Sequence, residues 1–262
     1  MKSEQFKQIP HLEGLDFIQA LLGLEEQRFE NSQYLKGSTF EEINADFGIF
    51  PTMATYPVYF AGDVRRPENK IIFMGINPGF GEESNKRERE FLRQYGVFEG
   101  YCRLYGDYFN GTTVRYYSNI AGFLKRLYPN QITERIDWDW FQEHLITLEL
   151  IPYHSVNAIG LRINNPVKYR EVYFEILLKL LGHLQPQKPI FINGFPTFRK
   201  FMTKKNGELL PEFVDVIEFT RHSSIVTGKI GKKYDFVGLP FLNYPKGGKD
   251  AIVAEVRKSG LY

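Results

Sequence analysis

The chain has 262 residues, of which 43% are hydrophobic and 24% are charged, a balance typical of a folded globular protein rather than a disordered one. Its 33 lysines and arginines face 31 aspartates and glutamates, so the net charge of +2 neither requires nor excludes a polyanionic partner. The single cysteine, Cys102, excludes an intramolecular disulfide and a cysteine-rich zinc site. No signal-peptide core or membrane-spanning run occurs, so we expect a cytoplasmic protein that does not contact a membrane.

The first 69 residues predict a helix followed by loops. Apolar residues recur at helical spacing within Leu15–Asn31, and Pro51, Pro57 and Pro67 interrupt the segment after it. No linker rich in proline, glycine or serine divides the chain. We therefore expect one domain over residues 1–262, with residues 1–69 as an N-terminal extension packed on it.

Short, continuous apolar runs in the rest of the chain predict buried strands, because strands covered on both faces lose the alternating pattern. These runs are Lys70–Gly75, Leu145–Pro152, Pro189–Gly194 and Phe236–Tyr244. Helical patterns lie between and after them, at Glu83–Tyr95, Asn119–Tyr128, Val167–Leu184, Thr197–Lys205 and Lys249–Ser259. The alternation predicts an α/β fold, a three-layer sandwich with a central, mainly parallel four-stranded sheet flanked by helices.

Ligands of such sheets bind outside the carboxyl ends of the strands. The loops that carry Asn77, Pro152, Gly194 and Pro245 should meet at that edge. We expect the functional site there.

The sequence Gly75-Ile76-Asn77-Pro78-Gly79 directly follows the first predicted strand. The glycines permit close backbone approach and the proline fixes a turn, which would present the Asn77 amide at the sheet edge. An ordinary strand-ending turn uses the same residue types and is the alternative interpretation.

This pentapeptide, placed directly after an apolar strand, resembles the first motif of the uracil-DNA glycosylase superfamily. The similar forms belong to its mismatch-specific and single-strand-selective monofunctional branches. The resemblance implies a DNA base-excision glycosylase that hydrolyses the N-glycosidic bond of a damaged or deaminated base, uracil or a related one, without metal or cofactor. It gives Asn77 the role of positioning or activating the water that attacks the anomeric carbon. It also places Gly75, Ile76, Pro78 and Gly79 at the substrate.

The end of the second predicted strand departs from the family. In the single-strand-selective branch an asparagine there reads the Watson–Crick edge of the base, and Glu149 stands at that position. An ionised carboxylate only accepts hydrogen bonds, so Glu149 would suit a base that presents two donors, or it is a structural residue. His154, just past Pro152, is a further substrate-binding candidate, with a structural role as the alternative.

The last family motif is a His-Pro-Ser or Asn-Pro-Ser turn before a helix, and Asn243–Lys249 is its counterpart here. Tyr244 takes the His position and Lys246 the Ser position. Tyr244 remains a catalytic candidate because its hydroxyl can donate to the departing base. Lys246, Gly247, Gly248 and Lys249 would hold a DNA phosphate at the helix start, unless they form only a glycine-rich turn.

The base-stacking aromatic implied by the resemblance falls on Phe91 or Phe80. The tyrosine-rich segment 96–117 offers a stacking surface or simply helix packing. Arg221-His222-Ser223-Ser224 superficially resembles the last family motif. The segments after it, Ile225–Gly228 and Lys229–Asp235, predict a hairpin rather than the helix of the family, so His222 is only a secondary candidate for a functional role.

The resemblance implies a protein that binds single- or double-stranded DNA, and we expect a monomer. Two alternatives stand beside the glycosylase hypothesis. One is a glycosylase-fold module that binds nucleic acid or a nucleotide without cleaving it, since two family positions are changed. The other is an unrelated α/β hydrolase or nucleotide-binding enzyme, although no nucleophile elbow, phosphate loop or dinucleotide fingerprint occurs.

Overall fold

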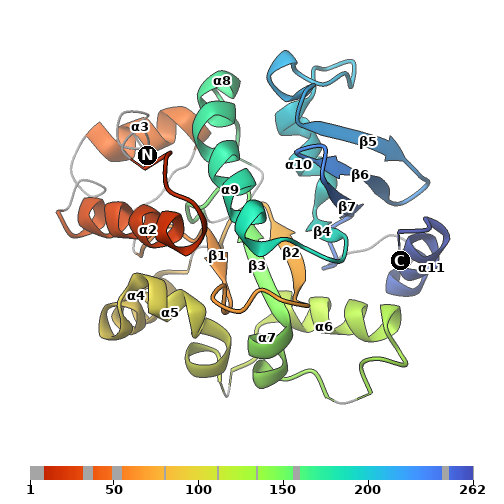
Figure 1. Cartoon of the computed structure of the whole chain (residues 1–262), viewed down its shortest axis with the longest axis horizontal. Coiled ribbons are helices and arrows are strands. Elements are labelled where there is room, and N and C mark those ends of the chain that lie inside the picture. The colour runs from red at the N-terminus through yellow and green to blue at the C-terminus, as the bar shows by residue number, and fades with distance from the viewer. Residues whose placement is uncertain are drawn as a thin grey trace.

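A computed structural model describes residues 9–31, 38–48, 55–79, 81–110, 112–133, 135–155, 160–243 and 248–261. These residues form an α/β structure around one mixed, seven-stranded sheet in the order β1-β3-β2-β4-β7-β6-β5 (Figure 1).

Four neighbouring strands of this sheet run parallel. Strand β2 (Ile71–Gly75) lies between β3 (Leu145–Glu149) and β4 (Ile190–Asn193), and β4 pairs with β7 (Tyr234–Leu239). Every residue of β2 and β4 is buried, as the continuous apolar runs predict. The predicted strand positions are confirmed, although β7 begins and ends earlier than the predicted Phe236–Tyr244.

The prediction of a four-stranded sheet is wrong, because three antiparallel strands extend it. Strand β1 (Phe60–Ala61) pairs with β3, while β6 (Val226–Ile230) joins β7 and carries β5 (Ile217–Arg221) at the edge. β5 and β6 are largely half-buried or exposed and β1 has two residues, so none shows a continuous apolar run. The predicted hairpin exists as β6–β7, with its turn at Gly231–Lys233.

Helices occupy all the predicted helical segments. The α-helices are α2 (Gly14–Glu30), α3 (Ser38–Phe47), α4 (Glu82–Tyr95), α5 (Val97–Cys102), α6 (Arg115–Leu127), α7 (Trp138–His144), α8 (Pro166–Tyr169), α9 (Glu175–Leu184), α10 (Phe195–Met202) and α11 (Gly248–Lys258). The π-helical turns η1 (Leu104–Tyr108) and η2 (Arg170–Phe174) and the short 3-10 helix η3 (Pro211–Phe213) complete the set.

Aromatic side chains join the helices to the sheet. Phe73 of β2 stacks on Phe191 of β4 with ring centroids 5.1 Å apart, and both rings contact Phe123 of α6. Helix α6 therefore covers the side of the sheet to which Phe73 points, and α11 packs beside it. Figure 1 shows α8 and α9 crossing in front of the strands, with α2 next to them.

The N-terminal segment contributes to the same core. Strand β1 belongs to the sheet, and Phe17, Leu21 and Phe29 of α2 are buried in the common hydrophobic cluster. A buried ion pair, Arg28 to Glu25 at 3.1 Å, lies on the same helix. Within the described residues, no helix is both long and apolar enough to cross a membrane.

Candidate functional site

A cavity of about 530 Å³ lies at the carboxyl ends of β2, β3 and β4, the edge where ligands of parallel sheets bind. Residues of the Gly75–Gly79 motif, the end of β3 and the first turns of α4 line it, together with an aromatic wall. The lining includes Gly75, Ile76, Asn77, Pro78, Gly79, Glu88, Tyr108, Phe109, Tyr116, Tyr117, Glu149, His154, Asn193, Phe241 and Asn243.

Asn77 is held in one orientation by its amide nitrogen. Nδ2 donates to the carbonyl oxygens of Pro78 at 2.9 Å and Tyr153 at 3.2 Å, and to Oγ of Ser155 at 2.7 Å. Because all three contacts use the nitrogen side of the planar amide, Oδ1 remains to accept a hydrogen bond from a water or a substrate. The predicted water-positioning residue thus has the donor and acceptor arrangement that this role needs.

The motif is joined to the segment after β3. Gly79 and Ser155 form an isolated parallel bridge, and the Ser155 amide donates to the carbonyl oxygen of Pro78 at 3.2 Å. These bonds fix Asn77 and His154 relative to each other, although 77 positions separate them in the chain.

Glu149 ends β3 and lies directly against Gly75. A Cβ atom at position 75 would stand 2.4 Å from Oε2 of Glu149 and 2.8 Å from Oε1, so any larger residue would require the end of the Glu149 side chain to move. Oε2 is buried and has no hydrogen-bond partner among the described residues. The close approach explains the first glycine of the motif by packing rather than by backbone conformation.

Burial changes the chemistry expected of Glu149. Desolvation raises the pKa of its carboxyl group to about 8, so the group is mostly uncharged at neutral pH. A neutral carboxylic acid has one O–H donor and one carbonyl acceptor, the same pair that an amide offers. An ionised Glu149 would only accept hydrogen bonds, whereas the raised pKa favours the neutral form, and the sequence position does not reveal this environment.

A second buried carboxyl group, Glu88 of α4, was not predicted as a site residue. Desolvation raises its pKa to about 8 as well. Its Oε1 lies 3.8 Å from Nε2 of His154, and neither atom has a hydrogen-bond partner within the described part of the chain. Helix α4 is so rich in charged residues that one inward-facing glutamate gives no signal in the sequence.

His154 is buried, and desolvation lowers the pKa of its imidazole to about 4, so the ring is neutral. Its Nδ1 lies 2.8 Å from Nδ2 of Asn85 and 2.8 Å from the carbonyl oxygen of Gly79. Nδ1 accepts from Asn85 in one tautomer and donates to Gly79 in the other. Since each tautomer has a partner, Nε2 can present either a proton or a lone pair to Glu88.

Tyr108, Phe109, Tyr116, Tyr117 and Phe241 form an aromatic wall of the cavity. The segment 96–117 supplies four of these rings, while its Tyr101 and Tyr105 are fully buried in the core. The tyrosine-rich segment thus provides core packing and part of the cavity lining, and its use as a stacking surface stays a prediction.

Phe91 does not reach the cavity; its ring lies behind Tyr108, with centroids 5.4 Å apart. Tyr108 rather than Phe91 therefore lines the cavity in this region. Phe80, the other predicted stacking residue, lies outside the described residues.

The start of α11 is connected to the cavity rim. Nζ of Lys249 donates to Oδ1 of Asn119 at 2.7 Å, and Nδ2 of Asn119 donates to Oδ1 of Asn243 at 2.8 Å. Gly248 begins the helix with φ of 79°, in the left-handed region that favours glycine. Tyr244, Lys246 and Gly247 lie outside the described residues.

His222 is not part of the cavity. It follows β5 in the turn toward β6, where its Nε2 lies 2.9 Å from Oγ1 of Thr227. The hairpin prediction that made it a secondary candidate agrees with this position.

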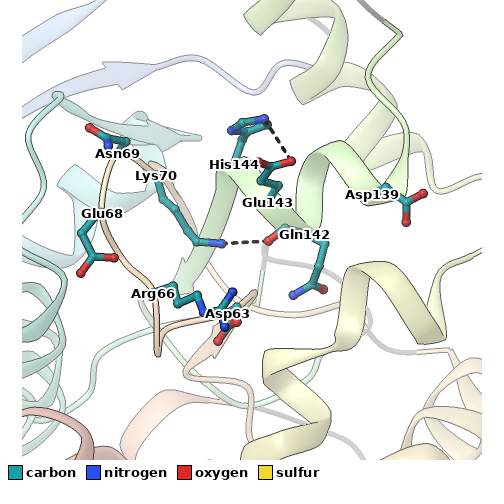
Figure 2. A pocket seen from close by; sticks show the side chains of 9 residues that line it. All are labelled: Asp63, Arg66, Glu68, Asn69, Lys70, Asp139, Gln142, Glu143 and His144. Atoms are coloured by element: carbon teal, nitrogen blue, oxygen red, sulfur yellow. Dashed lines mark hydrogen bonds and ion pairs between the residues drawn. The ribbon is translucent and has the colours of Figure 1, made fainter.

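Another hollow, of about 660 Å³, lies at the opposite edge of the sheet, where β2 and β3 begin (Figure 2). Nζ of Lys70 donates there to the carbonyl oxygen of Gln142 at 2.8 Å, and His144 lies beside Glu143. Its volume of about 660 Å³ exceeds the 530 Å³ of the cavity around Asn77. It lies, however, at the amino-terminal edge of the parallel strands, whereas ligands of such sheets bind at the carboxyl ends.

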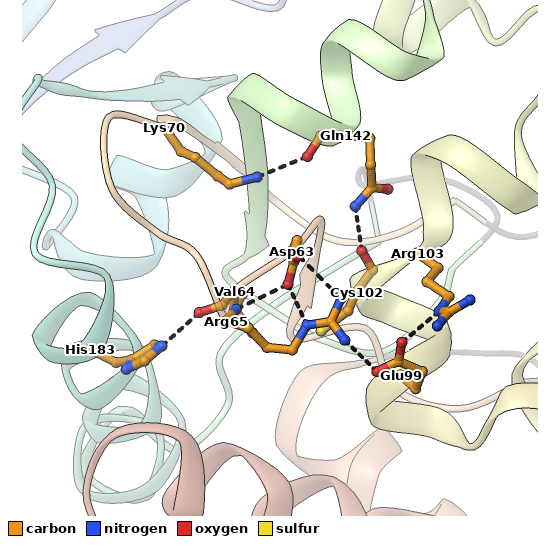
Figure 3. A network of polar contacts seen from close by, with 9 residues as sticks. All are labelled: Asp63, Val64, Arg65, Lys70, Glu99, Cys102, Arg103, Gln142 and His183. Atoms are coloured by element: carbon orange, nitrogen blue, oxygen red, sulfur yellow. Dashed lines mark hydrogen bonds and ion pairs between the residues drawn. The ribbon is translucent and has the colours of Figure 1, made fainter.

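The polar groups around that hollow tie elements together. Figure 3 shows Arg65 bonded to Asp63 and Glu99, and His183 of α9 bonded to the carbonyl oxygen of Val64 at 2.7 Å. Gln142 of α7 donates to the carbonyl oxygen of Cys102 at 2.6 Å. Because these side chains bond to one another and to backbone carbonyl groups, we interpret them as a structural network. We therefore place the candidate site in the cavity around Asn77.

Comparison of the chain with family models, with curated proteins and with solved structures finds no match. Among the described residues, no group of three or more histidine, cysteine, aspartate or glutamate side chains is placed to hold a metal ion.

Proposed function

We propose that the chain is a DNA base-excision glycosylase that binds an extruded base in the cavity around Asn77 and hydrolyses its N-glycosidic bond. The observation that carries the proposal is the uncharged Glu149 carboxyl group, packed on Gly75 beside Asn77. Its O–H and C=O can pair with a base edge that presents one acceptor and one donor, as uracil does.

The electrostatics of the cavity favour a neutral heterocycle. The described lining contains no lysine or arginine, and its two carboxyl groups and its imidazole are predominantly uncharged at neutral pH. A phosphate would meet no cation there, whereas a flat base can stack on the aromatic wall. Lys249, linked to the rim through Asn119 and Asn243, supports a phosphate position outside the cavity rather than within it.

Asn77 is assigned the positioning of the attacking water. The two N–H groups of its Nδ2 are shared among three acceptors, and this preorganisation fixes the orientation of Oδ1 before the reaction. Tyr244 remains the proposed hydrogen-bond donor to the departing base.

The experiment is a base-release assay on labelled oligonucleotides that carry uracil, hypoxanthine, xanthine or a thymine mismatch, in single and double strands. Alkaline cleavage reveals abasic sites. We expect release of at least one base, reduced about 10²-fold or more by Asn77→Ala. The matched control is Asn206→Ala, an exposed asparagine away from the cavity.

The alternative of a binding module without cleavage makes a different prediction in the same assay. It requires retention of an oligonucleotide with no abasic product at any pH, and Glu149→Ala would then weaken binding without affecting turnover. Two buried, uncharged carboxyl groups in one cavity favour catalysis over this alternative, because perturbed pKa values concentrate at catalytic sites. No product from the whole panel would refute the glycosylase proposal.

A further inference from the structure

The proposed reaction needs an acceptor for the proton of the attacking water, and Asn77 cannot be that acceptor. A carboxamide is not basic, and its nitrogen is already committed to three acceptors. A basic group must therefore come from elsewhere in the cavity. Glu149 is packed against Gly75, and we place the base there. The remaining candidates for the proton acceptor are Glu88 and His154.

Glu88 and His154 present two unsatisfied atoms to the same space. Oε1 and Nε2 are 3.8 Å apart, too far for a direct hydrogen bond but suited to one bridging atom that contacts both. Both atoms are buried and make no hydrogen bond of ordinary geometry in the described part of the chain, with the Thr55 hydroxyl near the Glu88 carboxyl group and the Tyr56 backbone near the His154 ring. Both side chains line the cavity.

The backbone places this pair next to Asn77. Asn77 donates to the carbonyl oxygen of Tyr153, the residue before His154, and the His154 ring lies against the carbonyl oxygen of Gly79, two residues after Asn77. Asn85 holds the imidazole from α4, the helix that carries Glu88, so both members of the pair are set by one local framework.

We propose that Glu88 and His154 together bind the attacking water and that Glu88 is the general base of the reaction. This inference rests on the proposed function. The water oxygen forms a bond to the anomeric carbon while the bond from that carbon to the base nitrogen breaks, and its electron pair leaves with the base. The Glu88 carboxylate takes the proton of the water, and the released base takes a proton from solvent. His154 acts as a positioning residue through Nε2.

The surroundings of Glu88 decide when it is basic. Among the described residues, the titratable groups that interact with it are His154 and the phenols of Tyr101, Tyr108 and Tyr117, all uncharged near neutral pH, and the Thr55 hydroxyl lies beside its carboxyl group. No lysine or arginine is among them. Since burial without a cation keeps the carboxyl group protonated, the fraction of active carboxylate rises tenfold for each pH unit below its pKa of about 8.

The base that the wild type releases is first identified with the oligonucleotides of the base-release assay. The test is then the single-turnover rate of release of that base between pH 5.5 and 7.5. The wild-type rate constant should rise about tenfold per pH unit. Glu88→Gln should lower it about 10²-fold or more at pH 7.5 and remove the pH dependence, while the Kd for the oligonucleotide changes less than about threefold. His154→Gln should lower the rate but keep the rise with pH.

Glu90→Gln is the matched control, because Glu90 is an exposed glutamate of the same helix. Glu88→Ala with added formate provides a second measurement: formate should restore activity to this variant and leave Glu90→Ala unaffected. Circular dichroism checks that each variant is folded.

The outcomes separate the two proposals. An active wild type whose rate and pH profile survive Glu88→Gln would overturn the general base and leave the glycosylase standing. A rate that falls as pH rises from 5.5 to 7.5, with the fall abolished by Glu88→Gln, would make Glu88 a proton donor and also overturn the inference. An inactive wild type would overturn both.

Discussion

Gly75 and Glu149 illustrate how one residue sets the chemistry of another. The missing side chain at position 75 lets the Glu149 carboxyl group lie on the β2 backbone, with Oε2 inside the van der Waals radius of an added Cβ. This position removes the carboxyl group from water and raises its pKa to about 8. The space left at Gly75 thus lets an acidic side chain lie where desolvation raises its pKa and favours the neutral form.

Substitution of Gly75 by alanine should displace Glu149. The added Cβ would meet Oε2 at 2.4 Å, so the end of the Glu149 side chain must move, and we expect a loss of about 1 kcal/mol in the free energy of unfolding. Chemical denaturation measures this. Gly79→Ala is the control, because no atom lies within 4 Å of its added Cβ, and it should change the stability by less than about 0.5 kcal/mol. Equal losses at both positions would contradict the packing argument.

Substitution of Glu149 by glutamine should preserve the donor and acceptor pair and remove its titration. We expect the affinity of the wild type for its preferred base to decline as pH rises through about 8, because the ionised carboxylate loses its donor. The Glu149→Gln variant should keep its affinity from pH 7 to pH 9. Fluorescence anisotropy with a non-hydrolysable substrate analogue measures both, and parallel declines would refute the assignment of Glu149 to the base.

Substitution of Asn77 by aspartate should be harmful, although the two side chains have nearly the same shape. One carboxylate oxygen would face the carbonyl oxygens of Pro78 and Tyr153 at about the present distances of 2.9 and 3.2 Å. We expect the variant to be about 1–3 kcal/mol less stable at pH 7, with the loss reduced below pH 5 as the carboxyl group gains a proton. Thermal unfolding at both pH values tests this, and a pH-independent loss would contradict it.

Helix α4 contributes two inward-facing residues to the site. Most of its charged side chains are exposed, but Asn85 is buried and Glu88 reaches the cavity. Oδ1 of Asn85 accepts from the Gly81 amide at 2.7 Å, which fixes the start of the helix, while Nδ2 contacts His154. The helix start and the imidazole therefore depend on the same amide.

Substitution of Asn85 by alanine should cost about 1–3 kcal/mol of stability, because it leaves the Gly81 amide and one side of the His154 ring without their partner. It should also slow base release by loosening His154. Differential scanning calorimetry and the single-turnover assay measure the two effects. Lys86→Ala, an exposed change in the same helix, is the control and should leave the stability within about 0.5 kcal/mol.

At the scale of elements, the sequence predicted the central strands well and the edges poorly. The runs ending at Gly75, Glu149 and Asn193 are apolar throughout because both faces of these strands are covered. Strands β5 and β6 have partly exposed faces, and β1 is two residues long, so their pairing depends on neighbours distant in the chain. The sheet consequently has three more strands than predicted.

For the whole molecule, the buried carboxyl groups of Glu88 and Glu149 should make stability depend on pH. Their folded pKa values, about 8, exceed the ordinary value of 4.5, so between these values the unfolded chain binds fewer protons than the folded one. Stability must then fall as pH rises. Between pH 6.5 and 8 we expect a loss of up to about 2 kcal/mol from each group, measurable by urea denaturation.

His154 acts in the opposite direction and at lower pH. Its folded pKa of about 4 lies below the ordinary 6.5, so its contribution is complete above pH 6.5 and is lost as pH falls toward 4. The window from pH 6.5 to 8 therefore isolates the carboxyl groups. The double variant Glu88→Gln/Glu149→Gln should show a nearly flat profile there; an unchanged slope would show that other groups are responsible.

The sequence by itself determined the α/β class, the four parallel strands and the gathering of the Gly75–Gly79 motif, Glu149 and His154 at one sheet edge. These features follow from local apolar runs and from the rule that parallel strands end on the same side. Only the tertiary structure decided that Glu149 is uncharged, that Glu88 faces His154, and that Tyr108 rather than Phe91 lines the cavity. The reason is physical: burial, protonation and side-chain contact depend on segments far apart in the chain, which no local pattern records.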